Sequence, residues 1–261
     1  MLRIRRLNMD TSWQLVWDDT SIILDPWLVG SEVDGFSWFN EQWHTTAPVP
    51  IKDLGSYDAL VVSQSYSDHC HEETLDLLPA SPIYGSPKAV KRLSESMGKR
   101  LTTLPDFEGG EWQEVGPISL AYLDPGRKLD PVYYGIVIRH KDQVVLYAPH
   151  GFTPTQHQLD LLSSYHVTLL ITSFSLFRLP GFMGGDVNPG MAKARTLVET
   201  LRPSKVVHTH DEEKRARGLV KKIARVVYPD YDLLKKDFPN TFVYLGEDYE
   251  YLTLSKSRSE A

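Results

Sequence analysis

Apolar and polar residues alternate over short segments at the start of the chain, a pattern typical of half-buried β-strands. Three such segments precede residue 31: LRIRRLN (2–8), WQLVWDD (13–19) and SIILDPWLVG (21–30). Asp18 and Asp19 separate the second from the third and indicate a tight turn, so the three segments predict an antiparallel meander. The next apolar segment, DALVVS (58–63), is short and rich in Val, which predicts a central strand covered on both faces.

Helical and strand-like segments alternate in the rest of the chain. Helices are predicted over 71–81 and over 86–98, where Ser86-Pro87 provides a start signal. A second meander is predicted over 111–116, 118–124 and 133–150, the last being a hairpin that turns at Lys141-Asp142. The remainder predicts helix 153–165, strand 167–174, helix 188–203, strand 205–210, a basic helix over 214–227 and strand 241–245.

Two β-rich halves that each end in helices predict an α+β fold, with two mixed or antiparallel sheets packed face to face and helices outside. The 261 residues suffice for one large domain, which we expect over residues 1–254. The polar segment SKSRSEA (255–261) is expected to be a flexible tail.

Charge and composition narrow the classes of function. A net charge of −6 gives no basic surface for nucleic acid or for an anionic membrane. No segment approaches the roughly 18–20 apolar residues of a spanning helix, and the opening MLRIRRLNMD lacks the apolar core of a secretory signal. The single cysteine excludes an internal disulfide. We therefore expect a cytoplasmic protein that acts on a small molecule; its oligomeric state is not predicted.

Residues with metal-binding or catalytic chemistry follow three of the predicted strands. Asp68 and His69 come after 58–63, His150 comes after the strand QVVLY, and His208 and His210 end 205–210. Loops at the carboxyl ends of strands are where layered α/β folds gather functional residues. Imidazoles and a carboxylate are ligands that zinc and iron(II) accept. In a regular strand His208 and His210 would point the same way.

Each of these residues also has a structural interpretation. A histidine at a strand end is often a hydrogen-bonded surface or cap residue, Cys70 is a small residue suited to a core, and His71 precedes a helix that it could cap. The glycine pairs 109–110 and 184–185 are more typical of turns than of phosphate binding. FRLPGFMGGD (177–186) could wall a pocket, with Asp186 as a polar contact, and the basic residues of 214–225 are typical of a solvated face.

The stretch SQSYSDHCH (63–71) and its surroundings resemble the metallo-β-lactamase superfamily, and the resemblance spans nearly the whole chain. ILDPWL (23–28) is similar to the N-terminal signature of that superfamily, and NPGMA (188–192) is similar to the start of its late helix. The combination of S-Q-x-x-x-D-H-x-H with P-H-G resembles a divergent branch of cyanobacteria and plants. The resemblance implies a four-layer αββα sandwich.

The H-x-H-x-D-H motif of the superfamily aligns with Gln64, Tyr66, Asp68 and His69, so two of its four ligands are present. Its later metal-bridging Asp falls at His150 and its last His ligand at His210. Its third His would lie near LDPGR (123–127), where this chain has only Asp124 and Arg127. The resemblance thus implies at most one metal ion, bound by Asp68, His69, His150 and His210.

Two hypotheses follow. In the first, one divalent ion, either zinc, which is the first choice, or manganese or iron, activates water for hydrolysis of an ester, lactone or phosphodiester. Tyr66 would then stabilise an oxyanion, and Asp68 or His71 would move protons. If all four ligands bind, a tetrahedral zinc would be closed, so catalysis needs an open position. In the second, no metal binds and the same residues shape a binding or scaffold surface; Gln64 and Tyr66 favour it.

Overall fold

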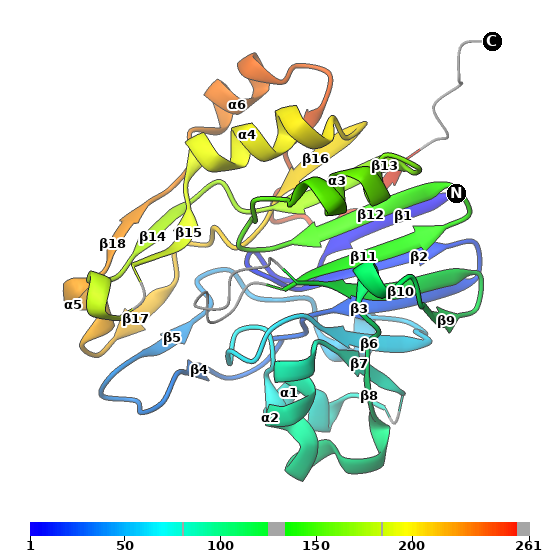
Figure 1. The fold of residues 1–261 in the computed structure, drawn as a ribbon. Coiled ribbons are helices and arrows are strands. Elements are labelled where there is room, and N and C mark those ends of the chain that lie inside the picture. Colours follow the sequence, from blue (N-terminus) through cyan, green and yellow to red (C-terminus); the bar gives the residue numbers. More distant parts are fainter. Residues whose placement is uncertain (80, 125–133, 184, 255–261) are drawn as a thin grey trace.

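Two seven-stranded sheets form the centre of the protein, described here from a computed structural model that covers residues 1–79, 81–124, 134–183 and 185–254 (Figure 1). The first sheet has the order β20 (Leu252–Leu254), β1 (Leu2–Arg6), β2 (Trp13–Trp17), β3 (Thr20–Leu24), β6 (Ala59–Val62), β7 (Ile83–Gly85) and β8 (Leu101–Thr103). Strands β20 to β3 are antiparallel, and β3 to β8 are parallel.

The second sheet repeats this plan. Its order is β19 (Phe242–Val243), β16 (Lys205–His208), β13 (His166–Thr172), β12 (Gln143–Ala148), β11 (Gly135–His140), β10 (Ile118–Leu123) and β9 (Gln113–Val115). Here β9 to β12 are antiparallel, and β12 to β19 are parallel. Both predicted meanders are confirmed, and the turns at Asp18 and Lys141 adopt positive φ values of 51° and 59°.

Six helices lie among the described residues: α1 (Glu72–Leu77), α2 (Pro87–Met97), α3 (Gln156–Leu162), α4 (Met191–Leu201), α5 (Val220–Ile223) and α6 (Tyr231–Asp237). Local sequence explains where they begin. The Ser86 hydroxyl accepts from the backbone N–H of Ala89, with Pro87 in the first turn, and Thr155 and Gln158 form a capping box. Short 3₁₀ segments occupy Ile51–Asp53, Gly98–Arg100, Phe107–Gly109 and Gly181–Met183.

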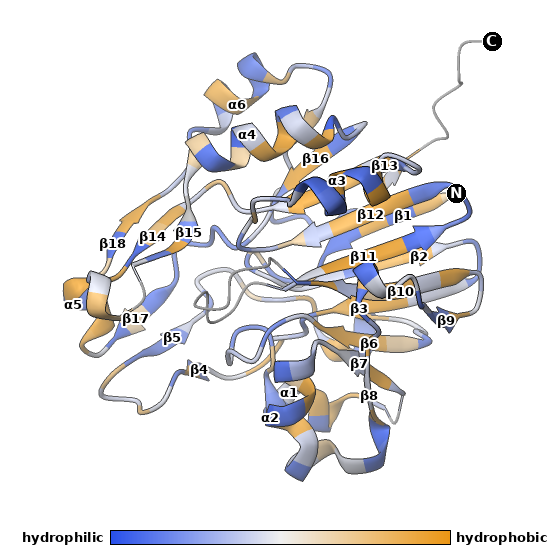
Figure 2. Ribbon diagram, in the orientation of Figure 1, coloured by the Kyte–Doolittle hydropathy of each residue, from blue (hydrophilic) through white to orange (hydrophobic). Residues whose placement is uncertain are grey.

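Three clusters of buried apolar side chains fill the space between layers. One joins the facing sides of the two sheets and includes Leu15, Val61, Ile138 and Leu169. A second lies between the second sheet and α3, α4 and α6, and a third lies between the first sheet and α1 and α2. Figure 2 shows hydrophobic residues along β11 and β12, whereas α3 and α4 carry both hydrophobic and hydrophilic residues. The α+β fold with two mixed sheets between helices is therefore confirmed.

Two small sheets extend one side of the molecule, away from the N-terminal strands (Figure 1). They contain β15 (Asp186–Pro189), β14 (Leu176–Arg178) and β18 (Arg225–Val227), and β17 (Arg215–Arg217), β5 (Glu41–Trp43) and β4 (Glu32–Val33). Across the described ranges, no helix combines the length and hydrophobicity that a bilayer crossing requires.

The prediction of one basic helix over 214–227 is wrong. This segment forms β17, the four-residue helix α5 and β18. Gly218 directly follows β17 with φ +102°, and a Cβ there would lie 2.6 Å from the carbonyl oxygen of Phe39. Arg217 donates to Glu41 at 2.7 Å, and the Arg215 guanidinium lies 5.1 Å from the Trp43 ring centroid. Pairing with β5 thus outweighs the helical spacing of the basic residues.

Two further differences concern strand ends. The strand predicted over 205–210 stops at His208, and the strand predicted over 241–245 is reduced to β19. The chain then returns as β20, which pairs with β1. The sequence did not predict β20. The predicted tail (255–261), Arg127 and Gly184 lie outside the described residues.

Candidate metal centre

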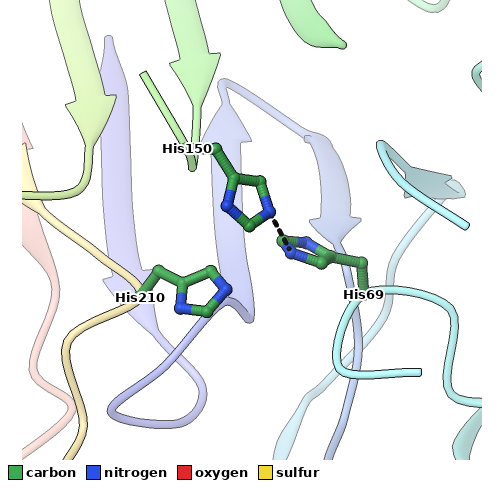
Figure 3. Close-up of side chains that lie close together, drawn as sticks. All are labelled: His69, His150 and His210. Carbon is green, nitrogen blue, oxygen red and sulfur yellow. Dashed lines mark hydrogen bonds between the residues drawn. The ribbon is translucent and has the colours of Figure 1, made fainter. Parts of the chain in front are cut away.

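Three histidines from separate strand ends lie together at one edge of the sandwich (Figure 3). The Nε2 atoms of His69 and His150 are 3.1 Å apart, and the ring centroids of His150 and His210 are 4.8 Å apart. One ring nitrogen from each of the three lies within 4.8 Å of the others. His69 and His150 are buried, and the His210 side chain is 13% exposed. The cluster is therefore shielded from bulk water.

Each histidine occupies a loop that follows a parallel strand of its sheet. His69 lies between β6 and α1, and His150 follows β12, where Gly151 at φ +66° lets the backbone turn. His210 follows β16 and has a left-handed φ of 54°, while its backbone N–H donates to the Asp10 carbonyl at 2.9 Å. This left-handed residue turns the chain after β16 and brings the His210 ring into the cluster.

Outer hydrogen bonds orient two of the rings. His69 Nδ1 lies 2.6 Å from Asp25 Oδ2, and His150 Nδ1 lies 2.7 Å from the amide oxygen of Asn188. Because both oxygens act as acceptors, each Nδ1 carries the hydrogen and each Nε2 faces the other ring. Asp25 is itself fixed by the Ser63 backbone N–H at 2.6 Å and the Tyr147 hydroxyl at 2.7 Å. Such outer partners are typical of metal-binding histidines.

The two facing rings differ in pKa. Burial lowers the pKa of His69, but the carboxylates of Asp68 and Asp25 outweigh this effect, and the pKa is raised. Burial, together with the neighbouring His210 and His69, holds the pKa of His150 well below its usual range. His69 can therefore donate a proton from Nε2 to neutral His150.

Asp68 and Asp10 form a second group beside the histidines. Asp68 Oδ2 lies 3.0 Å from His210 Nε2 and 3.8 Å from His69 Nε2, and Asp10 Oδ1 lies 3.4 Å from His210 Nδ1. Burial raises the pKa of Asp68, but His69, His210 and Lys214 outweigh it and hold that pKa well below its usual range. Asp68 is thus an anion in direct contact with His210.

The donor set fits a divalent ion such as zinc. Two nitrogens bound to tetrahedral zinc at about 2.0–2.1 Å lie roughly 3.3 Å apart, close to the 3.1 Å between His69 Nε2 and His150 Nε2. The outer hydrogen bonds already direct both nitrogens to one point. The described residues thus contain His and Asp groups that could bind a metal.

The residues near the positions of the three missing histidines have other surroundings. Gln64 donates to the Tyr134 carbonyl at 2.6 Å, and its Oε1 has no hydrogen-bond partner within the described ranges. Tyr66 is partly buried, and burial followed by the carboxylates of Asp34 and Asp68 raises its pKa. The Asp124 carbonyl accepts from the Gln158 side chain at 2.6 Å.

Four other candidates have structural partners. His71 is the N-cap of α1: its Nδ1 accepts from the Thr74 N–H at 3.2 Å, and its Nε2 lies 3.2 Å from the Ser31 carbonyl. Cys70 lies in the core beside α1 and α2, where burial raises its thiol pKa to about 12. His208 bonds to Asp211 at 2.7 Å, and Asp186 pairs with Arg178.

Sequence reasoning missed four residues around the cluster. Asp10 lies in the turn between β1 and β2, Asp25 directly follows β3, Asn188 lies in β15, and Lys214 follows the His210 loop. Asp25 is in the ILDPWL stretch, and Asn188 begins the NPGMA stretch, so both lay in segments that were already singled out. Asp10 and Lys214 carried no signal beyond their charge.

Residues 8–210 match the family model described as "Beta-lactamase superfamily domain". The matched segment begins just before Asp10 and ends at His210, so it contains the three histidines and Asp68. A search of the curated proteins finds no match.

Several solved structures share the fold. An isothiocyanate hydrolase from Delia radicum gut bacteria is 15% identical with a TM-score of 0.70, covering 97% of this chain and 99% of that chain. The metallo hydrolase Igni18 from Ignicoccus hospitalis is 14% identical with a TM-score of 0.69, over 98% and 100% of the two chains. A possible metal-dependent hydrolase from Veillonella parvula is 17% identical with a TM-score of 0.68, over 97% and 100%.

Proposed function

Because the chain belongs to the β-lactamase superfamily, we propose that it is a metal-dependent hydrolase with one divalent ion held by His69, His150 and His210. One observation carries the proposal: the outer bonds to Asp25 and Asn188 direct Nε2 of His69 and His150 to the same buried point. Imidazole nitrogens suit zinc, with manganese or iron(II) as further candidates.

A fourth protein ligand would close a tetrahedral zinc site, so we assign coordination to the three imidazoles and proton transfer to Asp68. The position of Asp68 supports this role, because its Oδ2 lies 3.0 Å from His210 Nε2 and 3.8 Å from His69 Nε2. A divalent ion in such a site supplies Lewis acidity and lowers the pKa of water. The low pKa of Asp68 keeps its carboxylate ionised and able to accept a proton.

Tyr66 is the candidate donor to a developing oxyanion. Burial, followed by the carboxylates of Asp34 and Asp68, raises its pKa and keeps the hydroxyl protonated and able to donate, and Tyr66 lies two residues before Asp68 in the chain. We assign no proton transfer to His71, because both of its ring nitrogens serve the start of α1 and Ser31.

The substrate class that we propose is a small ester, lactone or phosphodiester. A net charge of −6 disfavours nucleic acid as a substrate. Since one structural neighbour is named an isothiocyanate hydrolase, isothiocyanates belong in the same test. The metal-free binding protein is not favoured, because two Nε2 atoms facing each other in a buried site suit a cation better than an apolar or neutral ligand.

The test begins with protein stripped of metal by a chelator and reloaded separately with zinc, manganese and iron(II). Turnover would be measured on p-nitrophenyl acetate, bis(p-nitrophenyl) phosphate, a homoserine lactone and an aryl isothiocyanate. We expect hydrolysis of at least one substrate only after reloading, and its loss in His210→Ala. His166→Ala is the matched control, since His166 is exposed at the start of β13 and bonds to Ser204. Bound metal without turnover of any of the four substrates would contradict the proposed hydrolase activity and would mean that the metal has a structural role.

A further inference from the structure

We propose that Lys214 is a resident cation that takes the position of a second metal ion, so that the centre binds one divalent ion and not two. The inference rests on the proposed function, because it concerns the group that shares His210 with the histidine cluster. Asp10, Asp68 and His210 bring one ligand atom each within 4.8 Å of the others, which is itself a set that could hold a metal.

The ammonium group of Lys214 already contacts both carboxylates of that group. Its Nζ lies 2.8 Å from Asp10 Oδ2 and 3.9 Å from Asp68 Oδ2. Only 10% of the Lys214 side chain is exposed, and the Asp10 side chain is fully buried. Nζ also lies 5.3 Å from the ring centroid of Trp27, which is buried. A lysine on a solvated face would have none of these contacts.

Charge balance explains why this lysine is buried. Asp10 and Asp68 lie side by side out of water, and two buried carboxylates require compensating positive charge. Lys214 supplies it, with Nζ 2.8 Å from Asp10 Oδ2 and 3.9 Å from Asp68 Oδ2. A divalent ion that joined Asp10 and Asp68 would add two positive charges beside Nζ, which contacts the same two carboxylates, and like charges repel strongly in a buried site. The chain thus carries its own counter-ion where the Asp–Asp–His group could bind a metal.

The backbone around Lys214 fixes it in this place. The Asp10 carbonyl accepts from the His210 N–H at 2.9 Å and from the Thr209 hydroxyl at 2.7 Å, which ties the loop of Asp10 to the segment before Lys214. Glu212 accepts from the N–H groups of Thr45 and Thr46 at 2.7 and 3.0 Å. Strand β17 starts at Arg215, directly after Lys214, and pairs with β5. Segment 209–217 is therefore held on both sides of Lys214.

Metal stoichiometry tests this inference without reference to activity. Wild type, Lys214→Met, Lys214→Arg and the double variant Lys214→Met/Asp10→Asn would be equilibrated with excess zinc or manganese, desalted and analysed by elemental mass spectrometry. We expect about one ion per chain in wild type and in Lys214→Arg, and about two in Lys214→Met. The second ion should be lost again in the double variant, because Asp10 would no longer be charged.

Three results would overturn the inference. Two ions in wild type would show that Lys214 excludes nothing, and this result needs no variant to fold. One ion in Lys214→Met, with a circular dichroism spectrum and melting curve typical of folded protein, would do the same; Lys214→Gln serves if the Met variant does not fold. No ion in wild type would contradict the histidine centre itself, which separates failure of the proposed function from failure of the role of Lys214.

Discussion

His208 and His210 are two residues apart at the end of one strand, yet their surroundings differ in kind. The Leu245 N–H donates to His208 Nε2 at 3.1 Å, so Nδ1 carries the hydrogen and donates to Asp211 at 2.7 Å. The His208 ring also stacks on Tyr244, with centroids 4.8 Å apart. Every polar atom of that ring is satisfied within the fold.

His210 instead faces other groups that attract a cation. Its Nε2 contacts Asp68, its Nδ1 faces Asp10, and its ring lies beside His150 and His69. The change of direction comes from the left-handed backbone at His210, which breaks the alternation of the strand. Burial alone thus does not identify a functional histidine. What identifies it is the direction of a ring nitrogen that no structural hydrogen bond occupies.

The largest expected difference between the two histidines concerns metal content. His210→Ala should reduce bound metal from about one ion per chain to near zero, because a zinc site with two imidazoles left is incomplete. His208→Ala should keep the ion and lower the free energy of unfolding by about 1–3 kcal/mol, since Asp211 loses a buried partner. Elemental analysis and urea denaturation of both variants check this. Equal metal loss in the two would mean that the contrast between them is false.

The carboxylate partners of a cluster histidine and of His208 should differ in the same way in their effect on metal affinity. Asp25→Asn weakens the bond that orients His69, and we expect metal affinity to fall by about 10–100-fold. Asp211→Asn alters the partner of His208 and should leave affinity close to that of wild type. Competition with a chromogenic chelator measures both constants. Unchanged affinity in Asp25→Asn would remove the orienting role of Asp25.

A carboxyl group beside the centre provides a pH-dependent test of buried charge. Burial and then the carboxylates of Asp34 and Asp68 raise the pKa of Glu32 well above its usual range. The folded state therefore holds a proton that the unfolded state releases near pH 4.3, and stability falls as pH rises above that value.

Glu32→Gln removes this penalty and keeps an oxygen to accept from Ser67. We expect it to raise the free energy of unfolding at pH 7 by on the order of 1 kcal/mol, with no gain below about pH 4. Urea denaturation at both pH values checks the sign, and Glu199→Gln, on the exposed face of α4, is the control. A gain of equal size at both pH values would exclude ionisation of Glu32 as its cause.

The smallest expected effect concerns His71, which, like His208, has a structural role. His71→Ala should lower the free energy of unfolding by about 1 kcal/mol, because α1 loses its N-cap, and metal content should not change. Thermal denaturation and elemental analysis test the two parts separately. Loss of metal in this variant would place His71 with His210 instead.

The fold and the histidine cluster could be predicted from the sequence because their signals are local. Alternation predicted both meanders, and a histidine or aspartate after each apolar strand marked the edge where loops meet. The roles of Cys70 and His71 could not be decided in this way, because a core position or an N-cap depends on the neighbours of the residue.

What escaped prediction depends on contacts between distant segments. Lys214 belongs to a basic run whose spacing predicts a solvated helix, but pairing of β17 with β5 turns it towards Asp10. Asp10 reaches the centre only because the β1–β2 turn bonds to the His210 loop, almost two hundred residues away in the chain. Strand β20 was missed because its partner β1 lies at the other end of the sequence. Tertiary pairing, which no local pattern encodes, decided all three.

Anomalous diffraction from crystals of zinc-loaded protein, recorded on both sides of the zinc absorption edge, tests the central claim most directly. We predict one strong zinc peak within bonding distance of Nε2 of His69, His150 and His210. Absence of a peak there, or a peak bound by other residues while His69 and His150 remain hydrogen-bonded to each other, would contradict the histidine metal centre.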